Sequence, residues 1–141
     1  MSEPRAGHRT LPHTADTRVQ AWGPTLEECL AQAVLGTVES FLDISGATVT
    51  ERREVRLDPA EPPADRLVTL LDEVIYLMDV TGRAPVGAEL TRDRAGPLAR
   101  LDMADLAELP QIGAVPKAVS LHGLRVEERP DGWLCEVTLD V

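Results

Sequence analysis

Acidic residues stand near both ends of this 141-residue chain, each beside a segment with the pattern of a β-strand. Asp16 comes just before the alternating segment 18–22, and Asp140 is the next-to-last residue of the alternating segment 133–141. Period-two alternation places Asp140 on the polar face of its strand, opposite the apolar face that predicts burial. Because the sequence ends within that strand, we expect the terminal carboxylate of Val141 to be held in place rather than frayed. Two carboxylates at one strand end suit a hard divalent cation.

Each of these acids also has a plainer interpretation. Asp16, which follows His13 by three residues, is typical of a turn at the entry to a strand. Asp140 is equally explained as a charged residue on an edge strand, where it discourages pairing with other chains. The residue types alone therefore leave both a metal-binding and a structural interpretation open for each acid.

Two further sets of residues could do chemistry. Asp72 and Asp79, with Glu73 beside them, fall about two turns apart on one face of a predicted helix. They could act as a general acid–base pair only in a cleft, and a solvated helix face is the plainer interpretation. His122 lies beside a predicted β-bulge, where it either points at a site or is an ordinary polar strand residue.

The two cysteines and the short motifs give no catalytic assignment. Cys29 and Cys135 are too few and too far apart for a disulfide framework or a zinc site. Both occupy apolar-periodic positions, which favours packed free thiols. The sequence has no Gly-rich phosphate loop, nucleophile elbow or Cys/His ligand spacing. We therefore assign no catalytic residue and no residue that binds an organic cofactor.

The charge balance restricts the partners. The formal net charge is −10, and Lys117 is the only lysine beside thirteen arginines. Tight, direct nucleic-acid binding is not expected, because a phosphate backbone needs a positive stripe that this sequence lacks. A cation or a basic protein partner fits better. With no apolar leader at the start and no run of about 18 apolar residues, we expect a soluble, cytoplasmic protein without membrane contact.

The first half of the chain predicts a strand–helix–strand–helix order. Strand 18–22 is followed by Thr25, which caps a helix of about 17 residues with Glu28 at the capping-box spacing. Segment 48–57 reads as a strand, and Asp65 can cap a second helix that ends at Gly82. That helix carries an apolar stripe wider than a surface helix needs, which predicts that it is the central buried one.

The second half predicts two hairpins. The first spans 83–104 with its turn at 93–96, and the second pairs 117–128 with 133–141, with a bulge at His122–Gly123. Residues 1–12 lack periodicity and are expected to be a loosely ordered lead-in. The whole is predicted to be a single α+β domain over 1–141, with two helices packed on a mostly antiparallel sheet.

Four segments together resemble the archease family. The opening 13–16, followed by Ala21-Trp-Gly and Thr25-Leu-Glu-Glu, is similar to the start of archeases. The helix segment 70–79, the late strand 117–124 and the ending Leu139-Asp-Val also match, in the right order. Thr17 replaces the usual aliphatic residue and Asp72 replaces a usual Asn. The matches cover about half of the chain, and the resemblance implies an archease-like fold.

The resemblance also implies a function. Archeases are accessory proteins of the RtcB-type RNA ligase, which acts in tRNA splicing and RNA repair. They promote guanylylation of the ligase and its multiple turnover, and do not join RNA themselves. Family members bind a divalent cation, described as calcium. Carried over by position, its ligands here are Asp16, Asp140 and Val141.

Two alternatives from other classes stay open. One is a metal-dependent hydrolase that uses Asp16 and Asp140, with His122 as a third candidate, although no nucleophile, base and oxyanion set is recognisable. The other is a structural or ligand-binding module without enzymatic activity.

Overall fold

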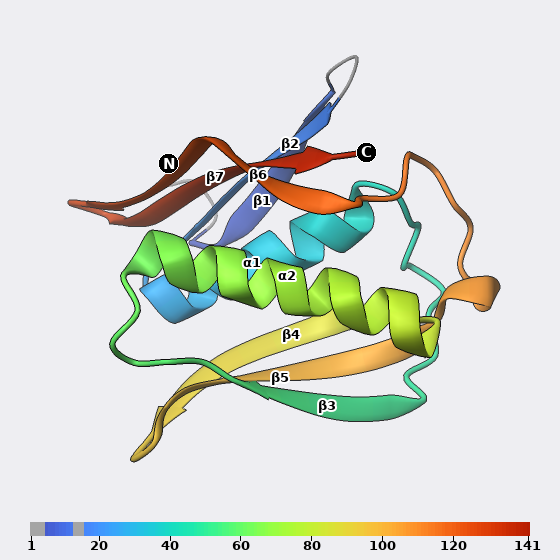
Figure 1. Ribbon diagram of the computed structural model, residues 1–141, viewed down its shortest axis with the longest axis horizontal. Helices are drawn as coiled ribbons and strands as arrows, with labels where there is room; N and C mark the ends of the chain where they lie inside the picture. Colours follow the sequence, from blue (N-terminus) through green and yellow to red (C-terminus); the bar gives the residue numbers. More distant parts are fainter. Residues whose placement is uncertain (1–4, 13–15) are drawn as a thin grey trace.

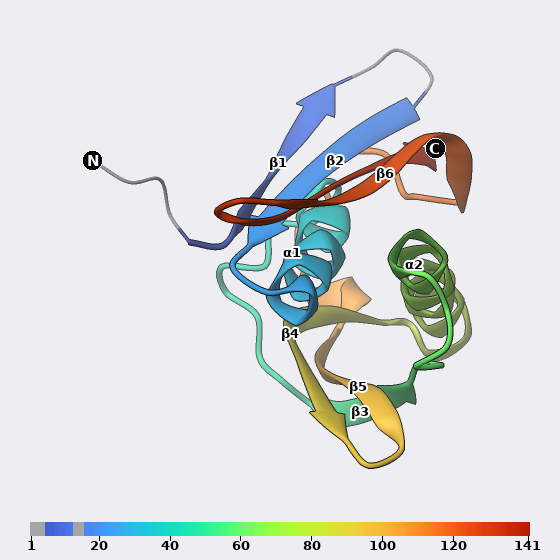
Figure 2. The same cartoon turned by 90° about the vertical axis from the view of Figure 1, so that its left-hand side faces the viewer.

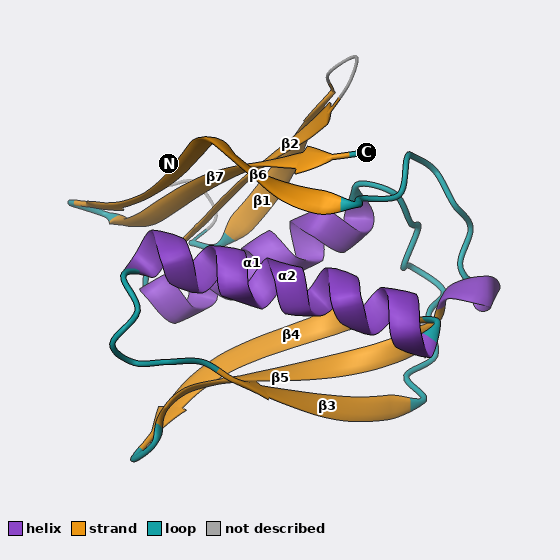
Figure 3. Ribbon diagram, viewed as in Figure 1, coloured by secondary structure: helices purple, strands orange, loops and turns teal. Residues whose placement is uncertain are grey.

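The computed structural model of the protein describes residues 5–12 and 16–141, and its elements form three layers (Figure 1). A layer of helices lies between a four-stranded sheet and a three-stranded sheet, as the colouring by secondary structure in Figure 3 shows. The described elements are β1 (Gly7–Pro12), β2 (Asp16–Gly23), α1 (Leu26–Glu39), β3 (Glu51–Arg56), α2 (Pro63–Thr81), β4 (Arg83–Asp93), β5 (Gly96–Asp105), a 3₁₀ turn (Leu106–Glu108), β6 (Ala118–Arg129) and β7 (Gly132–Asp140).

Both sheets are antiparallel. The larger has the strand order β1-β2-β7-β6, so the second strand of the chain pairs with the last one, and the smaller has the order β3-β5-β4. In the view of Figure 2, α1 lies under β1 and β2, and α2 lies under β6. The α+β prediction with two helices on an antiparallel sheet is confirmed, and the strands divide between two sheets.

The helix predicted after Thr25 is confirmed as α1. The Thr25 hydroxyl accepts a hydrogen bond from the backbone N–H of Glu28 at 3.1 Å and donates one to the Glu28 carboxylate, so Thr25 is the N-cap as predicted. This helix is buried on nearly all sides, because both sheets pack against it. The expectation that the second helix would be the central buried one is therefore wrong. Small residues such as Ala33 and Gly36 let the sheets approach α1 closely.

The second helix begins differently from the prediction. Its N-cap is Pro62 with Pro63 at the first helical position, and Asp65 lies within the first turn without capping it. The buried Arg66 ties the preceding loop to the helix, donating to the carbonyl oxygens of Pro59 and Glu61 at 3.2 and 2.9 Å. The predicted end at Gly82 is confirmed, with the left-handed φ of 68° that favours glycine.

Both predicted hairpins are confirmed, as is the bulge. The register between β6 and β7 shifts between Ser120 and Arg125, and Gly123 has a φ of 73°. The loose lead-in expected over 1–12 is wrong for Gly7–Pro12, which forms β1. This edge strand lacks apolar alternation, and its pairing with β2 supplies the order that its own sequence does not indicate. In the described part of the chain, no helix is long and apolar enough to span a membrane.

Candidate functional site

The two acids predicted as ligands lie directly opposite each other. β2 and β7 pair antiparallel, and Asp16 is the register partner of Asp140. Side chains in opposed positions share one face of the sheet, with Cβ atoms about 4.5–5.5 Å apart. Asp16 is half-buried and Asp140 is exposed. Residues from the two ends of the sequence therefore meet at one end of the four-stranded sheet.

The apolar face of the sheet fixes this register. Val19 pairs with Val137 and Ala21 pairs with Cys135, and all four side chains are fully buried. A slip by one residue would turn them toward solvent, which makes the register strongly specified. Burial of the core thus holds the two acids opposite each other.

Strand β6 adjoins Asp140 on its other side. Ala118 is the register partner of Asp140, and the backbone N–H of Lys117 donates to the Asp140 carbonyl oxygen at 2.7 Å. Val141 follows directly and is half-buried. In Figure 1 this strand end lies on the same side of the molecule as the loop that leads into β6. The backbone of Asp140 is therefore ordered from both sides.

The donor set at this strand end consists of oxygen atoms. Among residues 5–12 and 16–141, no three His, Cys, Asp or Glu side chains lie together in a way that could hold a metal ion. The predicted site therefore needs the main-chain carboxylate of Val141 beside the two carboxylate side chains. Oxygen donors fit Ca²⁺, which takes 6–8 oxygen ligands in flexible geometry. Like charges in opposed positions destabilise a sheet, a cost that a bound cation would offset.

Behind the two acids, on the same face of the sheet, Glu136 is buried among polar partners. Its carboxylate accepts a hydrogen bond from Gln20 Nε2 at 2.6 Å, forms an ion pair with Arg18, and lies 3.9 Å from the guanidinium of Arg125. The Gln20 hydrogen bond, followed by the charges of Arg18 and Arg125, lowers the pKa of Glu136 below its ordinary value. The carboxylate of Glu136 is thus compensated within the sheet.

The remaining sequence candidates lie elsewhere. His122 is exposed in the bulge of β6, where its backbone N–H donates to Ser120 Oγ at 3.1 Å. Asp72 and Asp79 are exposed on α2 and line a cavity. His13 lies outside the described residues. Of the candidates, the structure brings together Asp16 and Asp140.

The cysteines join α1 to β7. Cys29 and Cys135 are buried free thiols whose sulfur atoms lie 3.4 Å apart. The hydrogen-bonded contact with the Cys29 thiol, followed by burial, raises the pKa of Cys135. The predicted packed free thiols are confirmed, although their contact with each other was not evident from the sequence.

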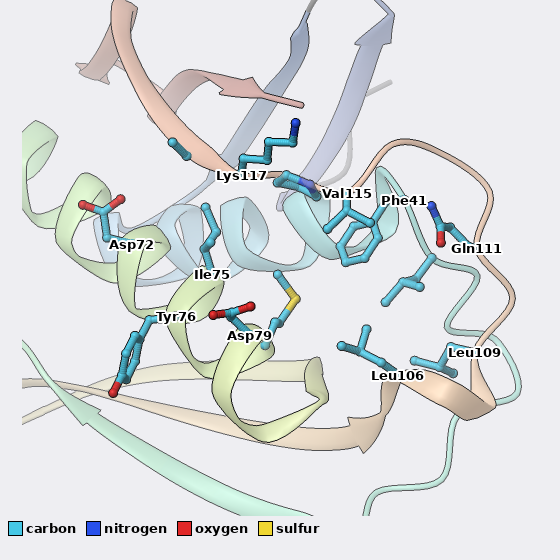
Figure 4. A pocket seen from close by; sticks show the side chains of 14 residues that line it. Phe41, Asp72, Ile75, Tyr76, Asp79, Leu106, Leu109, Gln111, Val115 and Lys117 are labelled. Carbon is cyan, nitrogen blue, oxygen red and sulfur yellow. The ribbon is translucent and has the colours of Figure 1, made fainter.

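Sequence reasoning missed the cavity beside the acidic strand end. It has a volume of about 810 Å³, lies between α2 and the segment 106–118, and is shown in Figure 4. The wide apolar stripe of α2 was the available signal, because Ile75 and Met78 from that stripe line the cavity. The other walls come from distant parts of the chain, which a periodicity analysis does not connect.

A second cavity, of about 510 Å³, lies at the opposite end of the four-stranded sheet. Arg5, Arg9 and Arg129 meet Trp22 and Trp133 there, and the Arg9 guanidinium stands 4.9 Å from the centre of the Trp22 ring. That distance is typical of a cation–π interaction. The Trp22 ring is therefore already in contact with a cation of the same chain.

Comparison with known proteins gives the relationship. Residues 8–141 match the model of the archease protein family. The chain belongs to this family. Over 136 residues it is 50% identical to a protein named "Probable protein archease" from Mycobacterium tuberculosis. The alignment covers 96% of this chain and 75% of that protein. The family predicted from the sequence motifs is confirmed.

More distant archeases share the full length of the fold. A "Protein archease" from Archaeoglobus fulgidus is 27% identical over 137 residues, covering 95% of this chain and 98% of that one. The solution structure of a Methanobacterium thermoautotrophicum protein superposes with a TM-score of 0.74 at 22% identity, covering 96% and 99% of the two chains. A crystal structure described as an archease and possible chaperone, from Thermotoga maritima, gives 0.65 at 24% identity, covering 100% and 98%. These two structures confirm the archease fold.

Proposed function

We propose that this archease-family protein is an activator of an RtcB-type RNA ligase and not an enzyme in its own right. It would promote guanylylation of the ligase and its multiple turnover in tRNA splicing or RNA repair. The observation that supports this most is the pairing of Asp16 with Asp140 at an accessible strand end. Family membership, and the match of these positions to the family's opening and ending motifs, supply the rest.

The proposal includes a divalent cation, Ca²⁺, held by Asp16, Asp140 and the carboxylate of Val141. When bound, the cation would supply a positive centre whose remaining coordination positions are open to water or to a group of the partner. The protein's own residues hold this end still: the buried register of β2 and β7 fixes the two side chains, and β6 fixes the backbone of Asp140.

Contact with the ligase would carry the activation. The acidic surface meets a basic region of the ligase, and the carboxylate end of β7 is presented to its nucleotide-binding site. This contact favours the ligase conformation that accepts GTP after each turnover, because a partner that binds one conformation more tightly shifts the equilibrium toward it. The net charge of −10 suits such an encounter with a basic surface.

Single-turnover guanylylation of purified ligase tests the proposal. We expect this protein, at a molar ratio to ligase below one, to raise the rate of guanylate transfer from GTP to the ligase. Each molecule would act on many ligase molecules in turn. No change in the rate would contradict the proposal. Hydrolysis of phosphoesters by this protein in the absence of ligase, lost in Asp16→Ala and Asp140→Ala, would instead support the metal-dependent hydrolase.

A further inference from the structure

We propose that the cavity between α2 and the segment 106–118 is a docking site for a basic, amphipathic segment of the partner protein. A large apolar side chain of that segment enters the cavity, and its Lys or Arg side chains pair with Asp72 and Asp79 on the rim. This inference rests on the proposed function for the identity of the partner, the RtcB-type ligase.

The cavity has an apolar interior of a suitable size. Its volume of about 810 Å³ lies within the range of roughly 300–1,000 Å³ that is usual for ligand pockets. Figure 4 shows Ile75 and Asp79 extending from α2 toward Phe41 and Leu106. Phe41, Leu42, Ile75, Met78, Leu106 and Leu109 line the interior. Binding of an aliphatic or aromatic side chain to this surface is favourable, because it removes apolar area from water.

The stripe of α2 is wider than its own core needs. The core positions of the helix are filled by residues that are fully or nearly fully buried: Leu67, Leu70, Leu71, Val74, Leu77 and Met78. Ile75 lies one position beyond this set, is only partly buried, and faces the cavity. Met78 lines the cavity as well, and its flexible thioether adapts to differently shaped partners. The stripe is thus wider than the core contact because Ile75 lines the cavity.

The acids of α2 have no ion-pair partner among the residues that the structure describes. The helix carries four acids, Asp65, Asp72, Glu73 and Asp79, and its only basic residue, Arg66, is buried against backbone carbonyls. In the described part of the chain none of these four acids forms an ion pair.

The smaller sheet behaves differently. Four of its acids pair with arginines of other strands at 2.7–3.3 Å: Asp102 with Arg52, Asp93 with Arg56, Asp105 with Arg83 and Glu54 with Arg100. Among the described residues the acids of α2 therefore lack ion-pair partners, and a basic partner molecule could supply the complementary charge.

The apolar interior and the acidic rim together favour one kind of binding partner. A nucleic acid would bring phosphates against Asp72 and Asp79, and a second copy of this chain would bring its own acidic surface, so both are disfavoured by like-charge repulsion. A basic segment with an apolar anchor uses both the interior and the rim. Lys117, on the opposite rim, favours an orientation in which the basic side of the segment faces α2.

The cavity shares two neighbours with the proposed metal site. Lys117 and Ala118 line it, and the same two residues pair with Asp140 through a hydrogen bond and the β6–β7 register. A segment docked in the cavity would therefore lie near the strand end that carries Asp140. Docking would place the partner so that its active site can reach this strand end.

Nuclear magnetic resonance with a model peptide tests the chemistry of the site. The ¹⁵N-labelled protein is titrated with a synthetic peptide of leucine and lysine at helical spacing, and separately with its leucine–glutamate counterpart. We expect the lysine peptide alone to shift the amide signals of α2 and 106–118. Equal binding of both peptides, or shifts confined to other surfaces, would overturn the proposal.

Purified ligase tests the docking itself. We compare the wild type with Asp72→Arg/Asp79→Arg, with Val115→Asp in the cavity wall, and with the control Glu128→Arg, an exposed residue at the far end of β6. The ¹⁵N spectra report that each variant is folded. We expect the ligase Kd to rise about tenfold or more in both cavity variants, as for the loss of a central contact, and to stay within about twofold in the control.

Stimulation of guanylylation separates the two proposals. We expect saturating amounts of the cavity variants to restore full stimulation, because docking and activation use different residues. If the wild type stimulates the ligase but the cavity variants bind it equally well, the docking inference is wrong and the proposed function stands. If the wild type neither binds nor stimulates the ligase, the proposed function fails, and docking of the ligase fails with it.

Discussion

At the scale of single residues, Asp16 and Asp140 occupy a position that costs the fold free energy. Carboxylates in directly opposed positions of an antiparallel pair repel each other, and pairs of this kind change stability by about 0.2–1 kcal/mol. The protein nevertheless holds them there through the buried residues on the other face. The cation site that we propose would offset this repulsion.

Replacing Asp140 by Asn tests the site in two ways. Without metal, the variant should be more stable than the wild type by about 0.2–1 kcal/mol, because an opposed charge is removed. With Ca²⁺ present, the wild type should gain stability by mass action and the variant should not. Thermal unfolding with and without Ca²⁺ measures both effects.

Calorimetric titration with Ca²⁺ provides the direct comparison. Asp16→Ala and Asp140→Ala should each abolish binding, whereas the control Glu128→Ala should bind like the wild type. Wild-type affinity in both aspartate variants would rule out the metal site.

Glu136 predicts a pH dependence. Because its pKa is lowered in the folded protein, its contribution to stability is complete above the unfolded carboxyl pKa of about 4.3, and it is lost as the pH falls through the folded pKa. Glu136→Gln should therefore cost about 1–3 kcal/mol at neutral pH, as for a hydrogen bond to a charged group. Urea denaturation should show this difference shrinking in acid. An equal difference at pH 7 and pH 3 would contradict the prediction.

At the scale of elements, the close approach of α1 to the larger sheet positions the whole strand pair. A Cβ atom on Gly36 would lie 2.7 Å from Val19 Cγ1 and 3.1 Å from His8 Cβ. Val19 belongs to the buried face that fixes the register of Asp16 and Asp140. The packing of this helix and the geometry of the candidate site are therefore linked.

Gly36→Val should destabilise the protein by about 1–3 kcal/mol, because added methyl groups overpack this contact. The control Gly46→Val should change stability by less than about 0.5 kcal/mol, since no atom lies within 4 Å of its Cβ position and the site is exposed. Denaturant midpoints of the two variants provide the measurement. A Gly36→Val protein as stable as the control would show that the contact is loose.

Elements with local signals were predictable from the sequence. The N-cap at Thr25, the stop at Gly82 and the bulge at Gly123 each depend on a few neighbouring residues, and all are confirmed. Strand β1 was missed because its order comes from pairing with β2 rather than from its own pattern. The central place of α1 was missed because small residues, which permit close packing, carry little periodic signal.

The candidate site was only partly predictable from the sequence. Alternation placed Asp140 on the polar face of its strand, but only the pairing of β2 with β7 puts Asp16 opposite it. The cavity joins residue 41, α2 and the segment 106–118, and such a meeting of distant segments follows from tertiary packing alone.

At the scale of the whole molecule, the distribution of charge matters more than its sum. In the smaller sheet, four acids form ion pairs with arginines. The acids of α2 and of the end of β7 form no ion pair with any residue that the structure describes; they include Asp72, Glu73, Asp79 and Asp140. A field of this kind steers a basic partner toward one side of the molecule.

The association rate with the ligase should therefore fall with salt. Charges are screened beyond about 8 Å at physiological ionic strength, so steering is lost first and the dissociation rate changes less. Stopped-flow measurements across a salt series should show a steep decline for the wild type and a shallower one for Asp72→Arg/Asp79→Arg. Equal slopes for the two proteins would mean that α2 takes no part in the encounter.

Multiple-turnover RNA joining by the purified ligase tests the central claim most directly. The number of RNA ends joined per ligase is counted without this protein, with the wild type, with Asp16→Asn/Asp140→Asn, and with the control Glu128→Gln. We predict that the wild type and the control raise the number of turnovers above one, and that the double variant leaves the ligase near a single turnover. Equal turnover with the wild type and the double variant, or no increase with either, would contradict an activator that works through the carboxylates of β2 and β7.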